Sequence, residues 1–473
     1  MTSEVVVMNR LGIALASDSA STVHIGGGRT KFYHADKLFM LSNHQPVGIM
    51  VFANSSLMGV PWETIIKLFR AQLGHTKLDR LSDYADELIR FLHRCASDLF
   101  PLEVQERYYF SMLETYFASM VETIKKQGYE IVEQVRTNKE SDSEIRALEA
   151  EIIEEALETW KKEKDVPADQ CTREIAVQME TVRSGEVNKL LADHFSHADS
   201  KVMDNLREIV RLIVCKKYIL PESLSGLVIA GFGEKEHFPS YQEYYIGEMY
   251  RGKLKYHLQS HAVISSEVPA IIVPFAQSEM SFTFLNGIGP VYQYRMYDEV
   301  STLIEKVPDA IFDDLKIRGK AKKKALKDAM EDHCRVHVRE LFERVKDFQV
   351  DYYRTPIMQS IEYLPKNELA HVAQSLVNLN SLQKRISISE DETVGGPIDV
   401  AVISKGDGFV WIDRKHYFKP ELNRHFFRNR MEDGLSNLNG ERNGHSLQAA
   451  KQPEKTLRKV TGGKTTRGTR QKR

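Results

Sequence analysis

The chain has 473 residues, of which 42% are apolar and 28% charged, fractions typical of a globular protein. Its formal net charge is −1, so overall charge favours neither a nucleic-acid nor a membrane partner. The four cysteines are far apart, and no basic, apolar leader opens the chain. These features argue against a zinc site, a disulfide framework and a secretory signal, and they predict a cytoplasmic protein.

Residues 1–75 predict a β-rich block followed by a helix. EVVVM and GIALAS are short β-rich runs joined by NRL, which is the pattern of a hairpin. A glycine-rich loop, HIGGGRT, comes next, and ADKLFMLS and PVGIMVFAN predict two further strands. From Pro61 the apolar spacing becomes helical, in PWETIIKLFRAQL.

Residues 80–218 are almost wholly helical in pattern and contain few glycines or prolines. Their most charged stretch, NKESDSEIRALEAEIIEEALETWKKEKD, predicts either a solvated amphipathic helix or a partner-binding arm. The β pattern returns in SLSGLVIAGFG and in a hairpin of SYQEYYIGEMY and KLKYHLQS. IIVPFAQSEMSFTFLNGIGP then predicts a strand that leads into a helix.

Residues 297–385 are again mainly helical. Within them, KIRGKAKKKALKDAMEDHCRVHVRELFERV has a basic start, which indicates a solvated face or a nucleic-acid contact. GGPIDVAVISKGDGFVWIDRK predicts two strands around a GDG turn. The basic, polar end of the chain is expected to be disordered, as a solubilising tail or a loose electrostatic contact.

The pattern is therefore three β-rich blocks separated by two helical blocks, which predicts an α+β protein with helices on the outer faces of stacked sheets. We expect six segments: a first core part, a helical insertion, a central core hairpin and helix, a second helical insertion, a last core part, and a tail. Their predicted bounds are 1–75, 76–220, 221–295, 296–360, 361–430 and 431–473.

Thr2 is a candidate nucleophile. A residue as small as threonine permits removal of the preceding Met1, which would leave Thr2 with a free α-amine. A threonine hydroxyl needs a base within reach, and an N-terminal threonine carries one in its own amine. A nearby lysine ammonium would keep that amine neutral by like-charge repulsion, and a carboxylate would hold the lysine in place.

Asp18 and Lys37 are the candidates for these two partners. Asp18 ends the second strand of the opening hairpin and Thr2 begins the first, so the antiparallel pairing places them side by side. Lys37 starts the next β-rich run. Taken singly, Asp18 suits a turn and Lys37 a solvated strand edge.

The opening MTSEVVVMNRLGIALASDSAST and the later ADKLFMLS resemble the start of proteasome β-subunits and their bacterial relatives, which are N-terminal nucleophile (Ntn) hydrolases. Thr2, Asp18 and Lys37 match that family's threonine, aspartate and lysine. The resemblance recurs in SGLVIAGFGEKEHFPSYQEYYIGEM and in GGPIDVAVISKGDG, and covers roughly residues 1–75, 223–290 and 362–416. It implies a four-layer αββα Ntn-hydrolase sandwich of two antiparallel sheets with two large helical insertions.

The resemblance implies three further site residues. Asp391 matches an aspartate that steadies the N-terminal threonine, and Asn54 matches the position of a backbone oxyanion donor. Ser278 in FAQSEMS matches the family's second serine, with Ser281 as a rival. The chain departs from the family pattern in carrying Val394 in place of a serine, and Asn54 in place of a glycine.

The prediction is thus a proteasome-like threonine peptidase or amidohydrolase that cleaves peptide bonds with Thr2 after Met1 is removed. The alternative is a catalytically silent proteasome-like scaffold or subunit whose helical insertions bind partners. A nucleic-acid-binding protein is a third interpretation, but the chain has no recognised motif for it.

The resemblance implies self-association as a homo-oligomer, a protein or peptide substrate, and neither metal nor organic cofactor. It also allows an ATP-driven partner, which this chain does not encode because it has no P-loop.

Overall fold

The structure is a computed structural model that describes residues 2–25, 29–134, 138–314, 320–386, 395–416 and 418–425. The chain divides into two compact units, Met1–Lys415 and His416–Arg473. The described part of the second unit contains the short 3₁₀ helix η2 (Pro420–Leu422). The first unit contains both large sheets and the candidate site.

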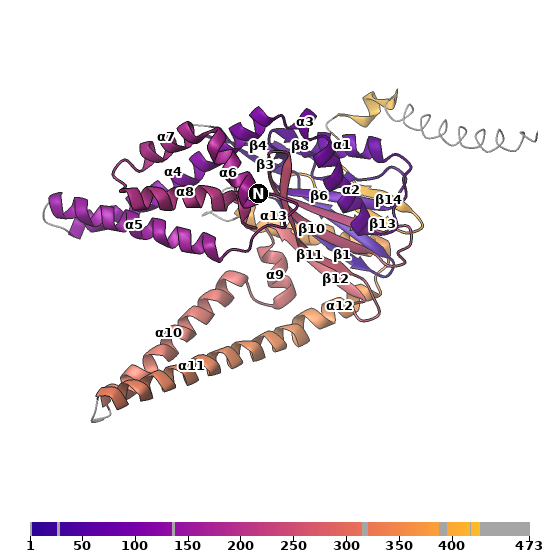
Figure 1. The fold of residues 1–473 in the computed structure, drawn as a ribbon. Coiled ribbons are helices and arrows are strands. Elements are labelled where there is room, and N and C mark those ends of the chain that lie inside the picture. The colour runs from indigo at the N-terminus through magenta and orange to yellow at the C-terminus, as the bar shows by residue number, and fades with distance from the viewer. Residues whose placement is uncertain are drawn as a thin grey trace, which may run out of the picture. The chain divides into compact units, whose positions relative to one another are not determined.

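The first large sheet is antiparallel and is built from segments far apart in the chain (Figure 1). Its order is β12 (Ala270–Ala276), β1 (Ser3–Asn9), β2 (Gly12–Ser17), β13 (Asp399–Ser404) and β14 (Gly408–Asp413). The hairpin predicted at the start of the chain is present, with Glu4 opposite Ser17. On its other side β1 pairs with β12, which places Ser3 opposite Ala276.

Every residue of β1 and β2 is buried because the two faces of these strands pack against different layers. Successive side chains of a strand point to opposite faces. Val5 and Val7 belong to a cluster with helix α13 (Lys366–Ile386), whereas Val6 and Met8 belong to a cluster with the second sheet. This double burial explains the near-continuous apolar sequence of the hairpin.

The second large sheet is also antiparallel. Its order is β11 (Lys253–Val263), β10 (Ser240–Tyr250), β9 (Ser225–Gly231), β6 (Val47–Ala53) and β5 (Leu38–Met40). Met50 and Val228 of this sheet pack with Val6 and Leu15 of the first sheet, so the two sheets face each other across a shared apolar layer.

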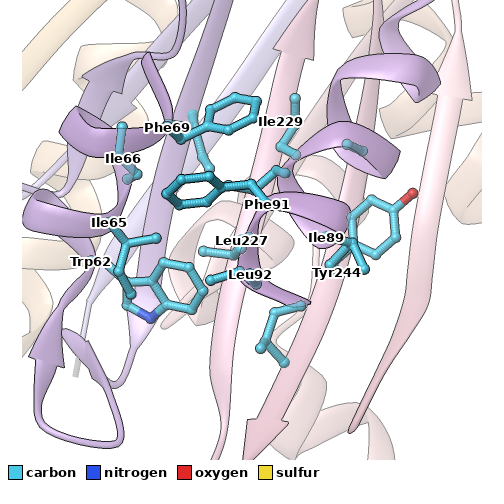
Figure 2. Packing of buried hydrophobic residues seen from close by; sticks show 14 of the residues in the cluster. Trp62, Ile65, Ile66, Phe69, Ile89, Phe91, Leu92, Leu227, Ile229 and Tyr244 are labelled. Carbon is cyan, nitrogen blue, oxygen red and sulfur yellow. The ribbon is translucent and has the colours of Figure 1, made fainter. Parts of the chain in front are cut away.

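Helices α1 (Trp62–Leu73) and α2 (Leu81–Arg94) cover the opposite face of the second sheet. Figure 2 shows Phe69 and Phe91, whose rings are 5.6 Å apart, beside Leu227 and Ile229 of β9. Each such side chain contributes about 1.5–3 kcal/mol when fully buried, so this layer is a large part of the core.

Two short antiparallel pairs complete the strands. β3 (Ala20–Ile25) pairs with β4 (Arg29–His34), and β7 (Ser56–Leu57) pairs with β8 (Val60–Pro61). The stretch predicted as a loop, HIGGGRT, therefore contributes its first two residues to β3 and its last two to β4, two strands that the sequence pattern did not indicate.

A helical block between α2 and β9 has an apolar core of its own. After the short α3 (Ala96–Leu99), its helices are α4 (Leu102–Gln134), α5 (Asn138–Lys162), α6 (Arg173–Val182), α7 (Ser184–His194) and α8 (Ser200–Cys215). Tyr109, Phe117 and Leu206 are among its fully buried side chains. Asp199 caps α8 by accepting a 2.8 Å hydrogen bond from the Val202 N–H.

The second helical block follows β12 and returns the chain to the first sheet. It comprises α9 (Glu279–Asn286), α10 (Pro290–Asp314), α11 (Lys320–Gln349), the π-helical turn η1 (Val350–Arg354), α12 (Thr355–Glu362) and α13. α10 and α11 pack against each other as a helical hairpin (Figure 1). Leu369, Ala373 and Val377 of α13 pack on β1 and β2.

The predicted α+β class with antiparallel sheets is confirmed. The predicted six-segment division stays a prediction, and α2, which falls inside the predicted first insertion, packs on the second sheet. Within the described residues, no helix combines the length and apolar character needed to cross a bilayer.

Candidate active site

Thr2 lies where β1 begins and is 4% exposed. Its carbonyl oxygen accepts a 2.8 Å hydrogen bond from the backbone N–H of Gln277, which continues the pairing of β1 with β12 by one residue. The start of the chain is therefore fixed in the sheet, as its strand pattern predicts.

Asp18 lies beside this start because it follows β2 directly. Its backbone N–H donates to the Ser3 carbonyl at 3.1 Å, and its Oδ1 accepts from the Ser3 N–H at 3.1 Å. The hairpin thus brings the Asp18 carboxylate next to the residue that follows Thr2.

Lys37 meets Asp18 from the second sheet. Its Nζ donates to Asp18 Oδ1 at 2.8 Å and also to the carbonyl oxygen of Ala20, and both charged side chains are almost completely buried. The Lys37 carbonyl accepts from the Val51 N–H at 2.9 Å, which fixes this backbone to β6. The structure therefore pairs Lys37 with Asp18 beside Ser3, the residue that follows Thr2.

A neighbouring ion-pair group holds the segment that carries Lys37. The Lys415 Nζ lies 3.0 Å from Asp36 and donates to the buried Asp399 at 2.5 Å. Asp399 also accepts from the Lys415 backbone N–H at 2.8 Å. Because Asp36 directly precedes Lys37, these contacts limit how far the lysine backbone can move.

The segment before β13 reaches Asp18 as well. The Gly395 N–H donates to Asp18 Oδ2 at 2.9 Å, and the Gly395 carbonyl accepts from Ala20 N–H at 3.0 Å. The predicted Asp391 lies outside the described residues, as does Val394, so the role of Asp391 stays a prediction.

Glu4 is a site residue that the sequence analysis missed. It is fully buried, and burial raises the pKa of its carboxyl to about 8 against the opposing influence of the Lys37 ammonium and of the hydrogen bond from Ser17. The signal was present in the sequence, because Glu4 is the one charged residue in SEVVVMN. An acidic residue inside a buried strand needs an explanation.

Asn54 directly follows Ala53, the last residue of β6, and both its backbone N–H and its side-chain amide donate hydrogen bonds. Its backbone N–H donates to the Leu224 carbonyl at 3.1 Å, and its Nδ2 donates to the Glu222 carbonyl at 2.7 Å. These bonds tie the end of β6 to the segment before β9. The Asn54 N–H is therefore engaged with Leu224 in this structure, and its role as an oxyanion donor stays a prediction.

The two serine candidates have different surroundings. Ser278 precedes α9, is partly exposed, and donates from its Oγ to the Ala276 carbonyl at 3.3 Å. Ser281 is fully buried and its Oγ accepts from Asn380 Nδ2 at 2.9 Å. Asn380 also donates to the Ser3 Oγ, so Ser281 belongs to the α13 side of β1. Ser278 is the serine nearer to an open surface.

Two alanines near the site have left-handed backbone conformations. Ala53 has φ 63° and Ala276 has φ 55°. They directly follow Phe52 and Phe275, whose stacked rings have centroids 6.3 Å apart. A non-glycine residue in this region costs about 1–2 kcal/mol, so the ends of β6 and β12 carry backbone strain.

A pocket of about 320 Å³ lies next to the paired end of β1 and β12. Its walls combine apolar side chains, such as Phe282 and Val291, with the polar Gln277 and Ser278. Gln277 connects the pocket to Thr2 through their backbone hydrogen bond. The size and mixed lining suit one or two side chains of a bound peptide.

Among the residues that the structure describes, no three His, Cys, Asp or Glu side chains are grouped so that they could hold a metal ion. What the site offers is a threonine at the start of a strand, a buried ion pair behind it and a second buried carboxyl. Groups of this kind support proton transfer and nucleophilic attack.

The chain matches no family model and no curated protein. Solved structures that match include an Anbu (Gly-1) mutant from Hyphomicrobium sp. strain MC1, with 8% identity over 96% of this chain and 100% of that one and a TM-score of 0.27. A helical assembly of the Anbu complex from Pseudomonas aeruginosa has 10% identity over 96% and 98%, with a TM-score of 0.27. Anbu (ancestral beta-subunit) from Yersinia bercovieri has 11% identity over 96% and 100%, with a TM-score of 0.25.

These comparisons correct the family assignment. The predicted membership in the proteasome β-subunit-like Ntn family is wrong as an identification, because no family model matches and the similar structures are distant Anbu proteins. Identities of 8–11% and TM-scores of 0.25–0.27 are too low to carry a functional argument.

Proposed function

We propose that this chain is an N-terminal threonine amidohydrolase that cleaves peptide bonds, with Thr2 as its nucleophile once the residue before it has been removed. The observation that carries the proposal is the buried ion pair of Lys37 and Asp18, 2.8 Å apart, beside the start of β1. Burying two charges costs several kcal/mol per ion before they attract each other, so a buried pair is weak evidence of stability alone. Its place beside a threonine favours a chemical role.

Each group has a distinct task in the proposed reaction. The Thr2 α-amine, whose unperturbed pKa is about 8, is the general base. The Lys37 ammonium disfavours protonation of that amine through like-charge repulsion. Asp18 fixes the lysine by accepting a hydrogen bond from its ammonium group and is itself oriented by the N–H groups of Ser3 and Gly395. Asp18 therefore positions Lys37, Lys37 favours the neutral Thr2 amine, and Thr2 reacts with the substrate.

The proposed reaction runs in two balanced steps. Thr2 Oγ attacks the amide carbonyl, the α-amine takes the hydroxyl proton, and that proton passes to the leaving amine as the C–N bond breaks. Water then attacks the resulting ester, the α-amine takes a proton from the water, and this proton returns to Thr2 Oγ as the acid product leaves. No redox change or external cofactor is required.

Two features support a peptide as the substrate. The pocket of about 320 Å³ beside Gln277 offers apolar walls with polar groups at its edge, which suits a side chain next to the scissile bond. The two face-to-face sheets with helices on their outer faces give Thr2 a rigid support. This layering is consistent with the proposed Ntn-hydrolase sandwich, which is part of the proposal.

The test is covalent labelling of the mature protein with a peptide epoxyketone, read by intact mass and peptide mapping. This reagent reacts with both the hydroxyl and the free α-amine of an N-terminal threonine. We expect loss of Met1 and a single adduct on Thr2. A protein that keeps Met1, or that loses it without forming an adduct, contradicts the proposal.

Two variants make this result specific. Thr2→Ala keeps a small residue after Met1, and therefore the free amine, but lacks the hydroxyl, so it must not form the adduct. Thr2→Ser keeps both groups and must still form it. Adduct formation by the alanine variant would place the reactive nucleophile elsewhere.

A catalytically silent scaffold is the second candidate, favoured by the engaged Asn54 N–H and by the 4% exposure of Thr2.

For either candidate we infer self-association with a second copy of the chain. Tyr292 and Tyr294 near the start of α10 are 67% and 72% exposed, and exposed aromatic side chains are typical of interfaces. Sedimentation of the wild type and of a Tyr292→Ser/Tyr294→Ser variant tests this, and a monomeric wild type contradicts it.

A further inference from the structure

Glu4 has an unusual environment for a carboxyl group. Its Oε1 accepts a 3.1 Å hydrogen bond from the Ser17 hydroxyl. Its Oε2 is buried and has no hydrogen-bond partner within the described part of the chain. A buried acceptor without a partner costs about 1–3 kcal/mol, so this side chain is not explained by stability.

The position of Glu4 relates it directly to Thr2. The two residues are two positions apart, so their side chains point to the same face of β1, the face toward the second sheet. Three charged or titratable groups act on Glu4 there: Lys37, Asp18 and Glu243 of β10. The Lys37 ammonium favours the ionised carboxylate, whereas Asp18 and Glu243 oppose it.

The net charge of the buried group formed by Lys37, Asp18 and Glu4 depends on the protonation of Glu4. Lys37 and Asp18 alone balance to zero. With Glu4 protonated the group stays neutral, and with Glu4 ionised it gains one negative charge. Because burial raises the pKa of Glu4 to about 8, the carboxyl is mainly neutral at pH 7 and ionises in mildly alkaline solution.

We propose that Glu4 sets the electrostatic potential at the Thr2 amine, and thereby the pH range in which Thr2 can act as a nucleophile. This inference rests on the proposed function, since it requires a free Thr2 amine. Glu4 is a positioning residue in this scheme, because it acts through charge and does not touch the substrate.

The direction of the effect follows from the sign of the charge. Protonated Glu4 carries no negative charge that could attract a protonated Thr2 amine, so the amine loses its proton easily. Ionised Glu4 attracts the protonated amine and makes the proton harder to remove. The amine and Glu4 therefore titrate together, and the amine titration becomes broad. Replacing Glu4 by the isosteric neutral glutamine removes the second titration.

The experiment measures the pH dependence of two reactions at Thr2, in wild type and Glu4→Gln. The first is the rate of epoxyketone adduct formation. The second is carbamylation of the Thr2 α-amine by cyanate, which follows its neutral fraction and does not need catalysis. We expect both profiles of Glu4→Gln to be steeper and shifted to lower pH by about half a unit to one unit.

Glu248→Gln is the matched control. Glu248 is also buried, and it also has an Oε2 without a hydrogen-bond partner among the described residues. It differs in its place: it lies on β10, and its Oε1 accepts from the Ser223 hydroxyl. It should leave both profiles unchanged. A thermal unfolding curve for each variant confirms that it is folded.

The outcomes separate the two proposals. A wild type that carbamylates at Thr2 but forms no epoxyketone adduct overturns the proposed function, and its cyanate profile still decides the role of Glu4. Superimposable profiles of wild type and Glu4→Gln overturn the role of Glu4 alone. An equal shift in Glu248→Gln also overturns it, and a retained Met1 overturns both.

Discussion

Asn380 and Ser3 are 377 positions apart in the chain, yet the side-chain amide of Asn380 donates a 2.8 Å hydrogen bond to the Ser3 hydroxyl. The same amide donates to Ser281 at 2.9 Å, and its Oδ1 accepts from the backbone N–H groups of Met280 and Ser281. One buried side chain therefore joins β1, α9 and α13 at the residue that follows Thr2.

Replacing Asn380 by alanine should destabilise the protein by about 2–4 kcal/mol, because several buried polar groups lose their partner at once. Urea unfolding measures this free energy. Asn367→Ala is the control, since Asn367 lies exposed in the first turn of the same helix and should change stability by about 0.5 kcal/mol or less. Equal effects of the two substitutions would contradict the bridging role.

Lys37→Met should slow epoxyketone labelling of Thr2 by about 10²–10⁴-fold, because the amine then loses the ammonium that keeps it neutral. It should also destabilise the fold by about 3–5 kcal/mol, since the Asp18 carboxylate stays buried without its cation. Labelling kinetics at pH 7 and urea unfolding give the two quantities.

The double variant Asp18→Asn/Lys37→Met separates these effects. Removing both charges should restore most of the stability but none of the labelling rate. Recovery of the rate in the double variant would show that Lys37 acts through the fold alone.

Ala276→Gly should stabilise the protein by about 0.5–1 kcal/mol, because glycine adopts the positive φ of this position without steric strain. Ala14→Gly is the matched control: Ala14 is buried in β2 with ordinary strand geometry, so the same change there should be destabilising. Urea unfolding distinguishes the two signs, and a loss of stability in Ala276→Gly would show that its strain is offset by other contacts.

Glu248 should make stability fall as pH rises. Burial raises its pKa from 4.5 to about 7, so between these values the folded state binds more protons than the unfolded state. The free energy of unfolding therefore decreases over this range, by about 3 kcal/mol in total. In Glu248→Gln this part of the pH dependence should be absent when urea unfolding is compared at pH 5 and pH 8. An unchanged difference between the two pH values would contradict it.

Local sequence patterns predicted the elements that carry strong periodicity. EVVVM and GIALAS correspond to β1 and β2, and IIVPFA corresponds to β12. The pairing of β1 with β12 could not be predicted from these patterns, because it depends on contacts between segments more than 250 residues apart. The β3–β4 pair was missed since glycines dominated the interpretation of that stretch.

The candidate site was predictable where chemistry and topology agreed. Asp18 was placed correctly beside the start of β1 because hairpin geometry fixes it. Asn54 was assigned by resemblance alone, and its N–H forms a bond to Leu224 that no sequence pattern indicates. Glu4 could have been found, since a single acidic residue in an apolar strand indicates a buried carboxyl group that needs an explanation other than packing.

The place of β1 between two neighbours has a consequence for timing during translation. β2 follows β1 immediately, but β12 begins only at Ala270. At a synthesis rate of about 5–20 residues per second, roughly a quarter of a minute to one minute separates the emergence of the two strands from the ribosome. Once β12 is paired, the Thr2 carbonyl is bonded within the sheet, so under the proposed function we expect the aminopeptidase that exposes the Thr2 amine to act on the nascent chain.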